Sequence, residues 1–248
     1  MHEPAPVVGA IIQARTNSTR LPGKAMLDIA GRSMVGRVVD RVRLSTTVQH
    51  VIVAVPDGRE DDALAEHVRA LGATLARGSE HDVLDRYYQA ARAAALDVVV
   101  RITSDCPLLD PDVLDQVVQL ATAPGSTVEY AANTLQRTFP RGLDVEVAPF
   151  EVLARLWREA TAPHERQHVF PYIHDRPGQF RLAGITHPVD RSGMRWTVDT
   201  PEDLAFARTV CAALPATYRW LDVVRLLDAH PEWLAINADV EQKSAHAN

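Results

Sequence analysis

A six-residue apolar run near the start of the chain, residues 7–12, constrains the fold more than any other feature. Its sequence, VVGAII, has no polar position, which is typical of a strand buried on both faces of a parallel sheet. A polar segment with three cations, residues 13–25, follows it, and the next apolar residues predict a helix over 33–45. Strand, cationic loop and helix in this order are typical of an open α/β sheet with a phosphate site at the carboxyl ends of its strands.

The same alternation continues through the first two thirds of the chain. Strands are predicted over 51–55 and 97–103, and helices over 60–71 and 81–96. Asp110 is placed to cap a further helix, with Pro111 at its first position. Strand–helix units with short links predict a mostly parallel sheet with right-handed crossovers.

The last third of the chain is less regular, and its polar end is predicted to be a disordered tail. Strands are expected within about 126–150, around a polar turn at 133–142, and helices over 151–175. Strands over 180–187 and 194–198 follow, then helices to about 238 and the tail at 241–248. A chain of 248 residues with this pattern predicts one domain over 1–240.

Composition narrows the class of function. The chain has 26 Lys and Arg against 32 Asp and Glu, which gives a net charge of −6. Because no basic stripe is interleaved with aromatic residues, a nucleic-acid partner is not expected. Two cysteines, Cys106 and Cys211, do not suggest a disulfide framework. The N-terminus lacks a signal-peptide pattern and no apolar run reaches 18 residues, so we expect a soluble cytoplasmic protein with no membrane partner.

The cations of the loop after the first strand are Arg15, Arg20 and Lys24. Two guanidinium groups and an ammonium group together suit a polyphosphate. The loop is not a Walker P-loop, because Gly31 and Gly36 have the required spacing but no Lys-Ser or Lys-Thr follows, and no G-x-G-x-x-G occurs either. The alternative is a solvated loop whose charges aid only solubility.

Two carboxylates are expected at strand ends. Asp105 follows the strand over 97–103, and Asp199 follows the one expected over 194–198. In an open α/β sheet these positions face the ligand site, and Mg²⁺ prefers one or two carboxylates together with substrate phosphates. The pair therefore predicts a magnesium site. The alternatives are a turn carboxylate for Asp105 and a place beside a helix cap for Asp199, where the Thr200-x-x-Asp203 capping pattern leaves Asp199 free.

Several motifs together resemble a known family. The loop QARTNSTRLPGK at 13–24, the segment TSDCPL at 103–108 and the segment VDTPEDL at 198–204 resemble the CMP-sugar synthetases, especially 3-deoxy-manno-octulosonate cytidylyltransferase. The segments DVLDRY at 82–87, PRGLDVEV at 140–147 and HERQHV at 164–169 are more similar to the SpsF-like branch of spore coat polysaccharide biosynthesis. The resemblance spans roughly residues 8–210 and implies a GT-A-like, Rossmann-like nucleotide-diphospho-sugar transferase sandwich, a CTP donor, Mg²⁺ and a homodimer.

On this basis we predict a Mg²⁺-dependent cytidylyltransferase that transfers CMP from CTP to an acidic sugar or similar small acid. Residues 133–190 would form an insert for acceptor binding and dimerisation. The octulosonate enzymes usually carry an acidic residue after the first metal aspartate, whereas this chain has Cys106, so either the substrate or the arrangement of residues around the metal ligands is expected to differ. The predicted site residues are Arg15, Arg20 and Lys24 for catalysis; Gln13, Ala14, Arg15, Ser79, Arg86, Arg101 and Thr103 for the nucleotide; Asn133, Arg137, Arg141, Asp144, Glu146, His164 and His168 for the acceptor; and Asp105 and Asp199 for the metal.

One motif points to a different chemistry. His164-Glu165-Arg166-Gln167-His168 is a literal H-E-x-x-H, and His174 stands where a third zinc ligand of a metzincin peptidase would be. Pro171 occupies the required glycine position and cannot adopt a positive φ, and Pro163 and Pro171 limit any helix here to about two turns. We therefore favour solvated histidines or acceptor contacts over a zinc peptidase.

Two further alternatives share the predicted fold. A glycosyltransferase of this type usually carries Asp-x-Asp at the first metal site, whereas Asp105-Cys106-Pro107 lacks the second aspartate. A nucleotide-binding protein without catalysis would not need two metal carboxylates. Both observations favour nucleotidyl transfer.

Overall fold

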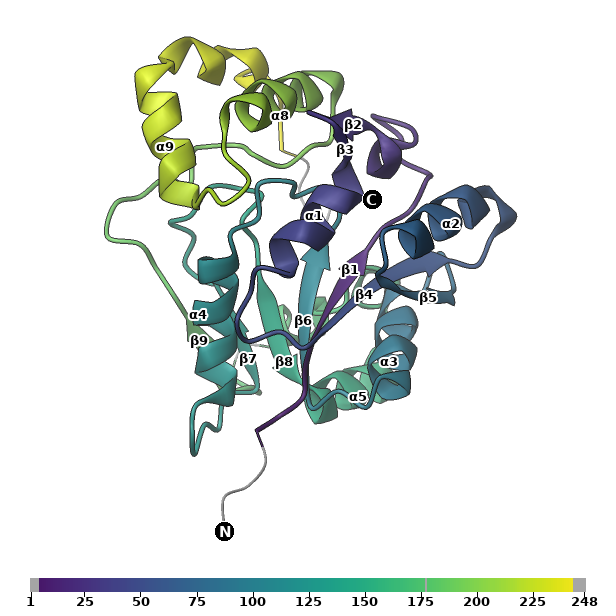
Figure 1. Cartoon of the computed structure of the whole chain (residues 1–248). Coiled ribbons are helices and arrows are strands. Elements are labelled where there is room, and N and C mark those ends of the chain that lie inside the picture. The colour runs from purple at the N-terminus through teal and green to yellow at the C-terminus, as the bar shows by residue number, and fades with distance from the viewer. Residues whose placement is uncertain (1–4, 177, 243–248) are drawn as a thin grey trace.

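The computed structural model describes residues 5–176 and 178–242. Within them a seven-stranded sheet has the strand order β5-β4-β1-β6-β8-β7-β9, and helices cover both of its faces (Figure 1). Four of the six strand pairings are parallel, and the two that involve β8 are antiparallel. The predicted α/β class with a mostly parallel central sheet is confirmed. The strands are β1 (Val8–Gln13), β4 (His50–Pro56), β5 (Thr74–Gly78), β6 (Val98–Thr103), β7 (Tyr130–Ala132), β8 (Glu146–Pro149) and β9 (Leu182–Gly184).

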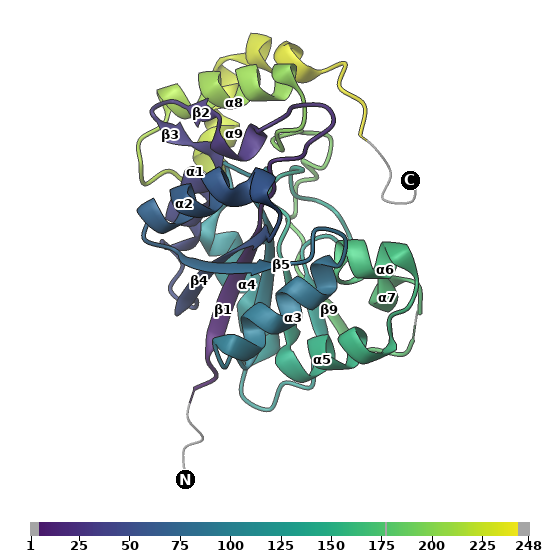
Figure 2. The same cartoon turned by 90° about the vertical axis from the view of Figure 1, so that its right-hand side faces the viewer.

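The helices form two layers and a cap, as the two views at right angles show (Figures 1 and 2). The three groups are α1 (Met34–Val42), α2 (Asp62–Ala70) and α4 (Pro111–Thr122) on one face; α3 (Val83–Ala93), α5 (Phe150–Glu159), α6 (Pro163–His168) and α7 (Pro171–His174) on the other; and α8 (Pro201–Ala213) with α9 (Trp220–Ala229) in the cap. Short 3₁₀ helices lie at η1 (Lys24–Met26), η2 (Arg59–Asp61) and η3 (Pro231–Asn237).

Three clusters of buried side chains hold these layers together. Successive residues of a strand point to opposite faces. Ile12 of β1 accordingly packs with Val38 of α1, whereas Ile11 packs with Leu84 of α3. The third cluster, around Trp196, joins α8 and α9 to β2 and to the first residues of α1 and α4. Among the described residues no helix is both long and apolar enough to cross a membrane.

Local signals set most helix ends. The Asp110 carboxylate accepts hydrogen bonds from the main-chain N–H groups of Asp112 and Val113, and Pro111 is the first residue of α4, as predicted. The Thr200–Asp203 capping box begins α8. Pro163 and Pro171 each begin a new short helix, so the helical region expected over 151–175 is divided into α5, α6 and α7.

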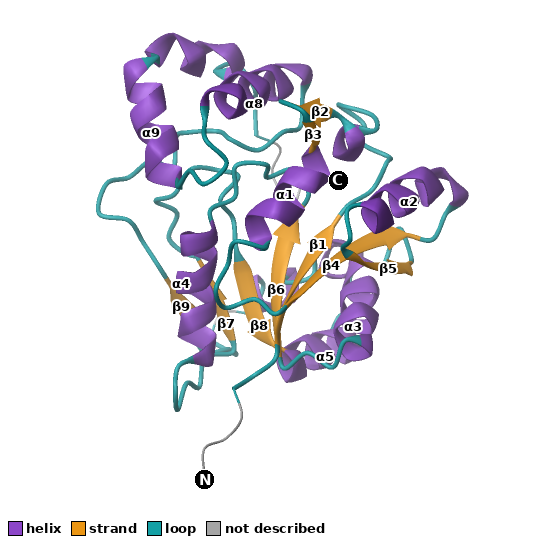
Figure 3. Cartoon of the chain, viewed as in Figure 1, coloured by secondary structure: helices purple, strands orange, loops and turns teal. Residues whose placement is uncertain are grey.

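Two strand predictions were wrong and two short elements were missed. Residues 194–198 form no strand and carry one isolated bridge, between Arg195 and Arg141. The connection from β9 to α8 is drawn as loop (Figure 3). The strand expected over 180–187 is shortened to β9. The edge strand β5 and the hairpin of β2 (Asp28–Ile29) and β3 (Arg32–Ser33) were not predicted, because neither shows a clear apolar alternation.

The segment 133–190 contributes β8 and β9 to the sheet and α5, α6 and α7 to one of its faces. This segment is therefore part of the same sheet as β1 and the cationic loop that follows it. The tail predicted from residue 241 lies, from residue 243 onward, outside the described residues.

Candidate active site

A cavity of about 670 Å³ opens at the carboxyl ends of β1 and β6. Along the chain, β4 and β5 are added on one side of β1 and β6 on the other, so the strand order reverses between β1 and β6. Open α/β sheets bind their ligands at such a switch point. The predicted site residues that line the cavity are Gln13, Ala14, Arg15, Arg20, Lys24, Arg86, Arg101, Thr103, Asp105, Arg137, Arg141, Asp144, Glu146, His168 and Asp199.

Three predicted residues lie outside that lining. The Asn133 side chain is buried, where its amide donates to Leu143 O and accepts from Val145 N. The Ser79 hydroxyl accepts a hydrogen bond from the main-chain N–H of Asp82, and the Ser79 carbonyl oxygen accepts one from the Arg86 guanidinium. His164 pairs with Asp175. The contacts of Asn133 and Ser79 fix the backbone next to the cavity, so these residues position lining residues without lining the cavity themselves.

The centre of the cavity is an ammonium group between two carboxylates. Lys24 Nζ lies 2.9 Å from Asp105 Oδ2, 2.8 Å from Asp199 Oδ1 and 3.0 Å from Val198 O. Burial opposes the charge on Lys24, but the two carboxylates outweigh it and raise the pKa of the ammonium group. Burial likewise opposes the charge on Asp105, but Lys24 and the Thr103 hydroxyl lower the pKa of this carboxyl to about 2. Asp105 and Asp199 thus both contact one cation, the Lys24 ammonium group, a contact that the sequence did not predict.

The cationic loop is anchored from a distant part of the chain. The N–H and the hydroxyl of Thr16 both donate to Asp61 Oδ1, at 2.6 and 2.7 Å, and Asp61 is fully buried. Gly23 ends the loop with a φ of 68°, a left-handed conformation that glycine adopts without strain. Arg20 reaches Asp199 Oδ2 at 3.1 Å, while Arg15 is more exposed and lies 3.9 Å from Glu80. The loop therefore has a fixed frame, in which ion pairs hold Lys24 and Arg20 while Arg15 is more exposed.

The floor of the cavity carries a buried ion pair. Arg101 of β6 pairs with Glu146 of β8, and Arg101 Nε also donates to Gln13 Oε1 at 3.2 Å. The Tyr130 hydroxyl donates to Glu146 Oε1 at 2.7 Å. Burial disfavours the Glu146 carboxylate, but Arg101 and the other donors lower the pKa of this group to about 2. An ion pair of this kind can form hydrogen bonds with the hydroxyl groups of a ligand and adds no net charge to the site.

Two arginines at the side of the cavity opposite the loop differ in their partners. Arg137 makes a two-pronged contact with Asp144, at 2.6 and 2.8 Å. In the described part of the chain no group accepts a hydrogen bond from the half-buried Arg141 guanidinium, and burial lowers its pKa. Arg141 therefore leaves this side of the cavity with an uncompensated positive charge that suits an anionic group.

Sequence reasoning missed part of the lining. Glu80 and His81 follow the edge strand β5, so they were missed together with that strand. Ser18 and Thr19 lie within the loop that was identified, and a search for hydroxyl groups there would have found them. The missed lining residues are Ser18, Thr19, Glu80, His81, Val83, Ser104, Cys106, Thr134, Gly142, Gln167, Thr197 and Gln242.

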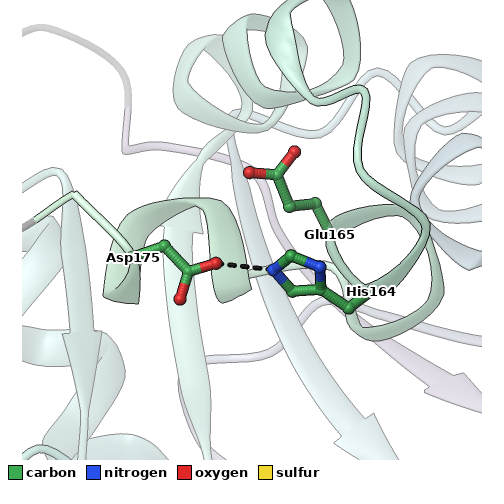
Figure 4. Close-up of side chains that lie close together, drawn as sticks. All are labelled: His164, Glu165 and Asp175. Atoms are coloured by element: carbon green, nitrogen blue, oxygen red, sulfur yellow. Dashed lines mark hydrogen bonds and ion pairs between the residues drawn. The ribbon is translucent and has the colours of Figure 1, made fainter. Parts of the chain in front are cut away.

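The H-E-x-x-H segment does not assemble a peptidase site. Its histidines have separate surroundings: His164 pairs with Asp175, His168 lines the cavity, and His174 contacts Tyr130. Among the described residues, the ligand atoms within 4.8 Å of one another are those of His164, Glu165 and Asp175 (Figure 4). The Glu165 carboxylate is already bound to the N–H groups of Thr161 and Ala162 and to Arg176. These contacts stabilise the start of α6, so Glu165 has a structural role that does not require zinc.

His168 ends α6, and the next residue turns the chain sharply. Val169 has a φ of 73° and a ψ of −57°, and Phe170 N donates to His168 O at 3.0 Å, which defines a γ-turn. A positive φ is strained for a β-branched residue. Burial and the charge of Arg101 lower the pKa of His168, so its imidazole faces the cavity in the neutral form.

The fold and this site define a nucleotide-binding α/β enzyme with a cationic loop and two converging carboxylates. The family model of the cytidylyltransferases matches residues 9–224, and the chain belongs to this family of nucleotidyltransferases. It is 34% identical over 200 residues to the spore coat polysaccharide biosynthesis protein SpsF of Bacillus subtilis, covering 78% of this chain and 81% of that protein.

Two further similarities agree with this assignment. The chain is 36% identical over 113 residues to the 3-deoxy-manno-octulosonate cytidylyltransferase of Geobacter sulfurreducens, covering 45% of this chain and 44% of that protein. A solved cytidylyltransferase structure from Leptospira borgpetersenii superposes with a TM-score of 0.88 at 32% identity, covering 96% of this chain and 99% of that one. The predicted family is confirmed.

Proposed function

We propose that this enzyme transfers CMP from CTP to an acidic sugar or similar small acid, with Mg²⁺, and releases pyrophosphate. The observation that carries the proposal is the convergence of Asp105 and Asp199 on one cation, between the cationic loop and the uncompensated Arg141. CTP is the donor that the name of the family implies. The similarity to SpsF and to the octulosonate enzyme supports an acceptor that enters a polysaccharide.

The nucleotide binds along the β1 side of the cavity. Arg15, Arg20 and Lys24 bind the triphosphate and stabilise the charge that develops on the leaving pyrophosphate. Gln13, Ala14 and Thr103 lie at the carboxyl ends of β1 and β6, beside the place for the α-phosphate and the ribose. Arg86 and Arg101 bind the cytidine half, and Ser79 holds Arg86 in place through its carbonyl oxygen.

The two carboxylates suit the metal. Asp105 and Asp199 would hold Mg²⁺, and the contact of both carboxylates with the Lys24 ammonium group supports a shared cation site. Bound there, the metal would neutralise phosphate charge and favour the ionised form of the acceptor hydroxyl. A metal ion and the ammonium group compete for one place, so Lys24 is available to the phosphates when the metal is bound.

In the reaction, an acceptor oxygen forms a bond to the α-phosphorus of CTP and loses its proton. The bond from that phosphorus to the β-phosphate bridging oxygen breaks, and its electron pair leaves with pyrophosphate. Such transfers depend mainly on positioning and on neutralising charge. Arg141 binds the acid group of the acceptor. Arg137, Asp144, Glu146 and His168 orient its hydroxyl groups, while Asn133 holds the backbone of Leu143 and Val145 behind the lining.

The test is a screen of the four ribonucleoside triphosphates against a panel of sugar acids, with pyrophosphate release as the measurement. We expect release with CTP and Mg²⁺, and a loss of at least about a hundredfold in Asp105→Asn and Asp199→Asn, because each removes a metal ligand worth several kcal/mol. Asp228→Asn, at an exposed carboxylate of α9, is the matched control. Full activity in either site variant, or activity unaffected by chelation of divalent ions, would refute the metal assignment.

A further inference from the structure

The carboxylate of Asp199 is held in one orientation by two arginines. Arg195 NH2 and Arg20 NH2 each lie 3.1 Å from Asp199 Oδ2. The other oxygen, Oδ1, is the one that faces Lys24 at 2.8 Å. One oxygen is therefore occupied by guanidinium groups, while the other is presented to the cavity.

Arg195 is itself fixed by a buried carboxylate. Its Nε and NH2 donate to the two oxygens of Asp203, both at 2.8 Å, and the Asp203 side chain is fully buried. Asp203 Oδ2 also accepts the main-chain N–H of Asp199 at 3.0 Å. Asp203 thus fixes Asp199 twice, through its backbone and through Arg195. A helix cap alone requires only the contacts with Thr200.

The last member of this chain of contacts comes from η3, near the C-terminal end of the described residues. Asn237 Nδ2 donates to Asp203 Oδ1 at 2.9 Å and to Arg195 O at 3.1 Å, and Asn237 is 6% exposed. A little further on, Gln242 accepts a hydrogen bond from Arg195 NH1 and lines the cavity. Asn237 and Gln242 lie beyond residue 224, where the match to the family model ends.

We propose that Asn237, Asp203 and Arg195 form a positioning relay that aims Asp199 Oδ1 into the site, so that the C-terminal segment belongs to the catalytic apparatus. Residues 194–199 need such support because they are not a strand: their main chain bonds to Arg141 and Asp105 rather than along a continuous neighbouring strand. The inference rests on the proposed role of Asp199 as a metal ligand. Partners of this kind orient ligating carboxylates, and their loss typically weakens metal binding 10- to 100-fold.

The experiment measures Mn²⁺ binding to the CTP-saturated protein by water-proton relaxation. We expect Asn237→Ala and Arg195→Lys each to weaken Mn²⁺ binding by about tenfold or more, with CTP affinity changed less than about twofold. Lysine keeps the charge at 195 but lacks the fork that spans Asp203. Glu232→Ala, at an exposed position of η3, is the matched control and should bind Mn²⁺ like the wild type.

The melting temperature of each variant separates positioning from simple stability. A lower melting temperature with unchanged Mn²⁺ affinity in both variants would mean that the cluster only holds the fold, and would overturn the proposal. If Asn237→Ala does not fold, Arg195→Lys decides alone. Asp199→Asn is the reference: if it binds Mn²⁺ as the wild type does, the metal assignment itself fails and the relay fails with it. If Asp199→Asn loses Mn²⁺ while the other variants keep it, only the relay is wrong.

Discussion

At the scale of single residues, Lys24 decides the resting state of the site. Its ammonium group bridges carboxylates that lie 81 and 175 residues further along the chain. Two partly buried carboxylates this close would repel each other without a cation between them. Lys24 therefore offsets the charge of both carboxylates in this structure.

Replacing Lys24 with methionine should have two opposite effects. The rate of pyrophosphate release should fall by roughly a hundredfold, since a preorganised charge at a leaving group is worth about 3 kcal/mol. Without nucleotide, Mn²⁺ should bind more tightly than to the wild type, because the competing cation is gone. Arg69→Met, at an exposed position of α2, is the control. An unchanged rate would show that Lys24 does not act on the phosphates.

The Arg101–Glu146 pair gives a prediction for stability and its pH dependence. Glu146→Gln leaves the Arg101 charge on the cavity floor without its partner, which should lower the free energy of unfolding by about 3 kcal/mol at pH 7. The pKa of Glu146 is about 2 in the folded protein against its usual 4.5, so this stabilisation is complete above pH 4.5 and is lost as the pH falls toward 2.

Urea denaturation of wild type and Glu146→Gln at several pH values measures this difference. Asp62→Asn, which removes the exposed partner of Arg77, should cost less than about 1 kcal/mol and serves as the control. A difference for Glu146→Gln that stays constant between pH 5 and pH 2.5 would contradict the role of this pair.

At the scale of elements, the extended segment 194–199 is the least regular part of the site and depends on a neighbouring glycine. Its backbone pairs with Arg141 through Met194 O and Trp196 N, at 2.9 and 2.7 Å. Gly142 follows with a φ of 105°, and a Cβ there would lie 2.7 Å from the backbone of Trp196 and Thr197. Only glycine permits this close approach without displacing the segment that carries Asp199.

Gly142→Ala should therefore move that segment. We expect a loss of more than about 2 kcal/mol in the free energy of unfolding, or a folded protein with weakened metal binding. Gly125→Ala is the matched control, because Gly125 also has a positive φ of 75° but nothing lies near its added Cβ. It should cost only about 1–2 kcal/mol from backbone strain. Equal losses in the two variants would show that the contact with residues 196–197 has no effect.

At the scale of the whole molecule, the cavity is lined by residues of the loops that follow β1, β5, β6 and β7, together with Gln242 near the C-terminal end of the described residues. These parts come from nearly the full length of the described chain. The homodimer implied by the family resemblance remains a prediction. Light scattering should give twice the chain mass of 27.3 kDa, and a mass of one chain over a range of concentrations would contradict it.

The sequence alone determined the features that rest on local signals. Apolar runs predicted β1, β4 and β6, because strands buried on both faces are apolar over most of their length. Asp110 and Thr200 predicted helix starts, because a cap acts within four residues. The cations after β1 and the carboxylate of Asp105 were expected at the cavity because the carboxyl ends of parallel strands meet at one edge. Asp199 also lines the cavity, although the strand that was expected to carry it did not form.

The tertiary structure decided what these groups contact. No local pattern shows that Asp61 anchors the loop, that Lys24 lies between two aspartates, or that Asn237 reaches Asp203. The segment 194–198 has the alternation of a strand, but its neighbours leave it only one bridge. The three histidines of the H-E-x-x-H region have a zinc spacing in sequence, but two prolines divide the helix and turn their side chains to different partners. Such contacts join residues far apart along the chain, so they follow from packing rather than from local preference.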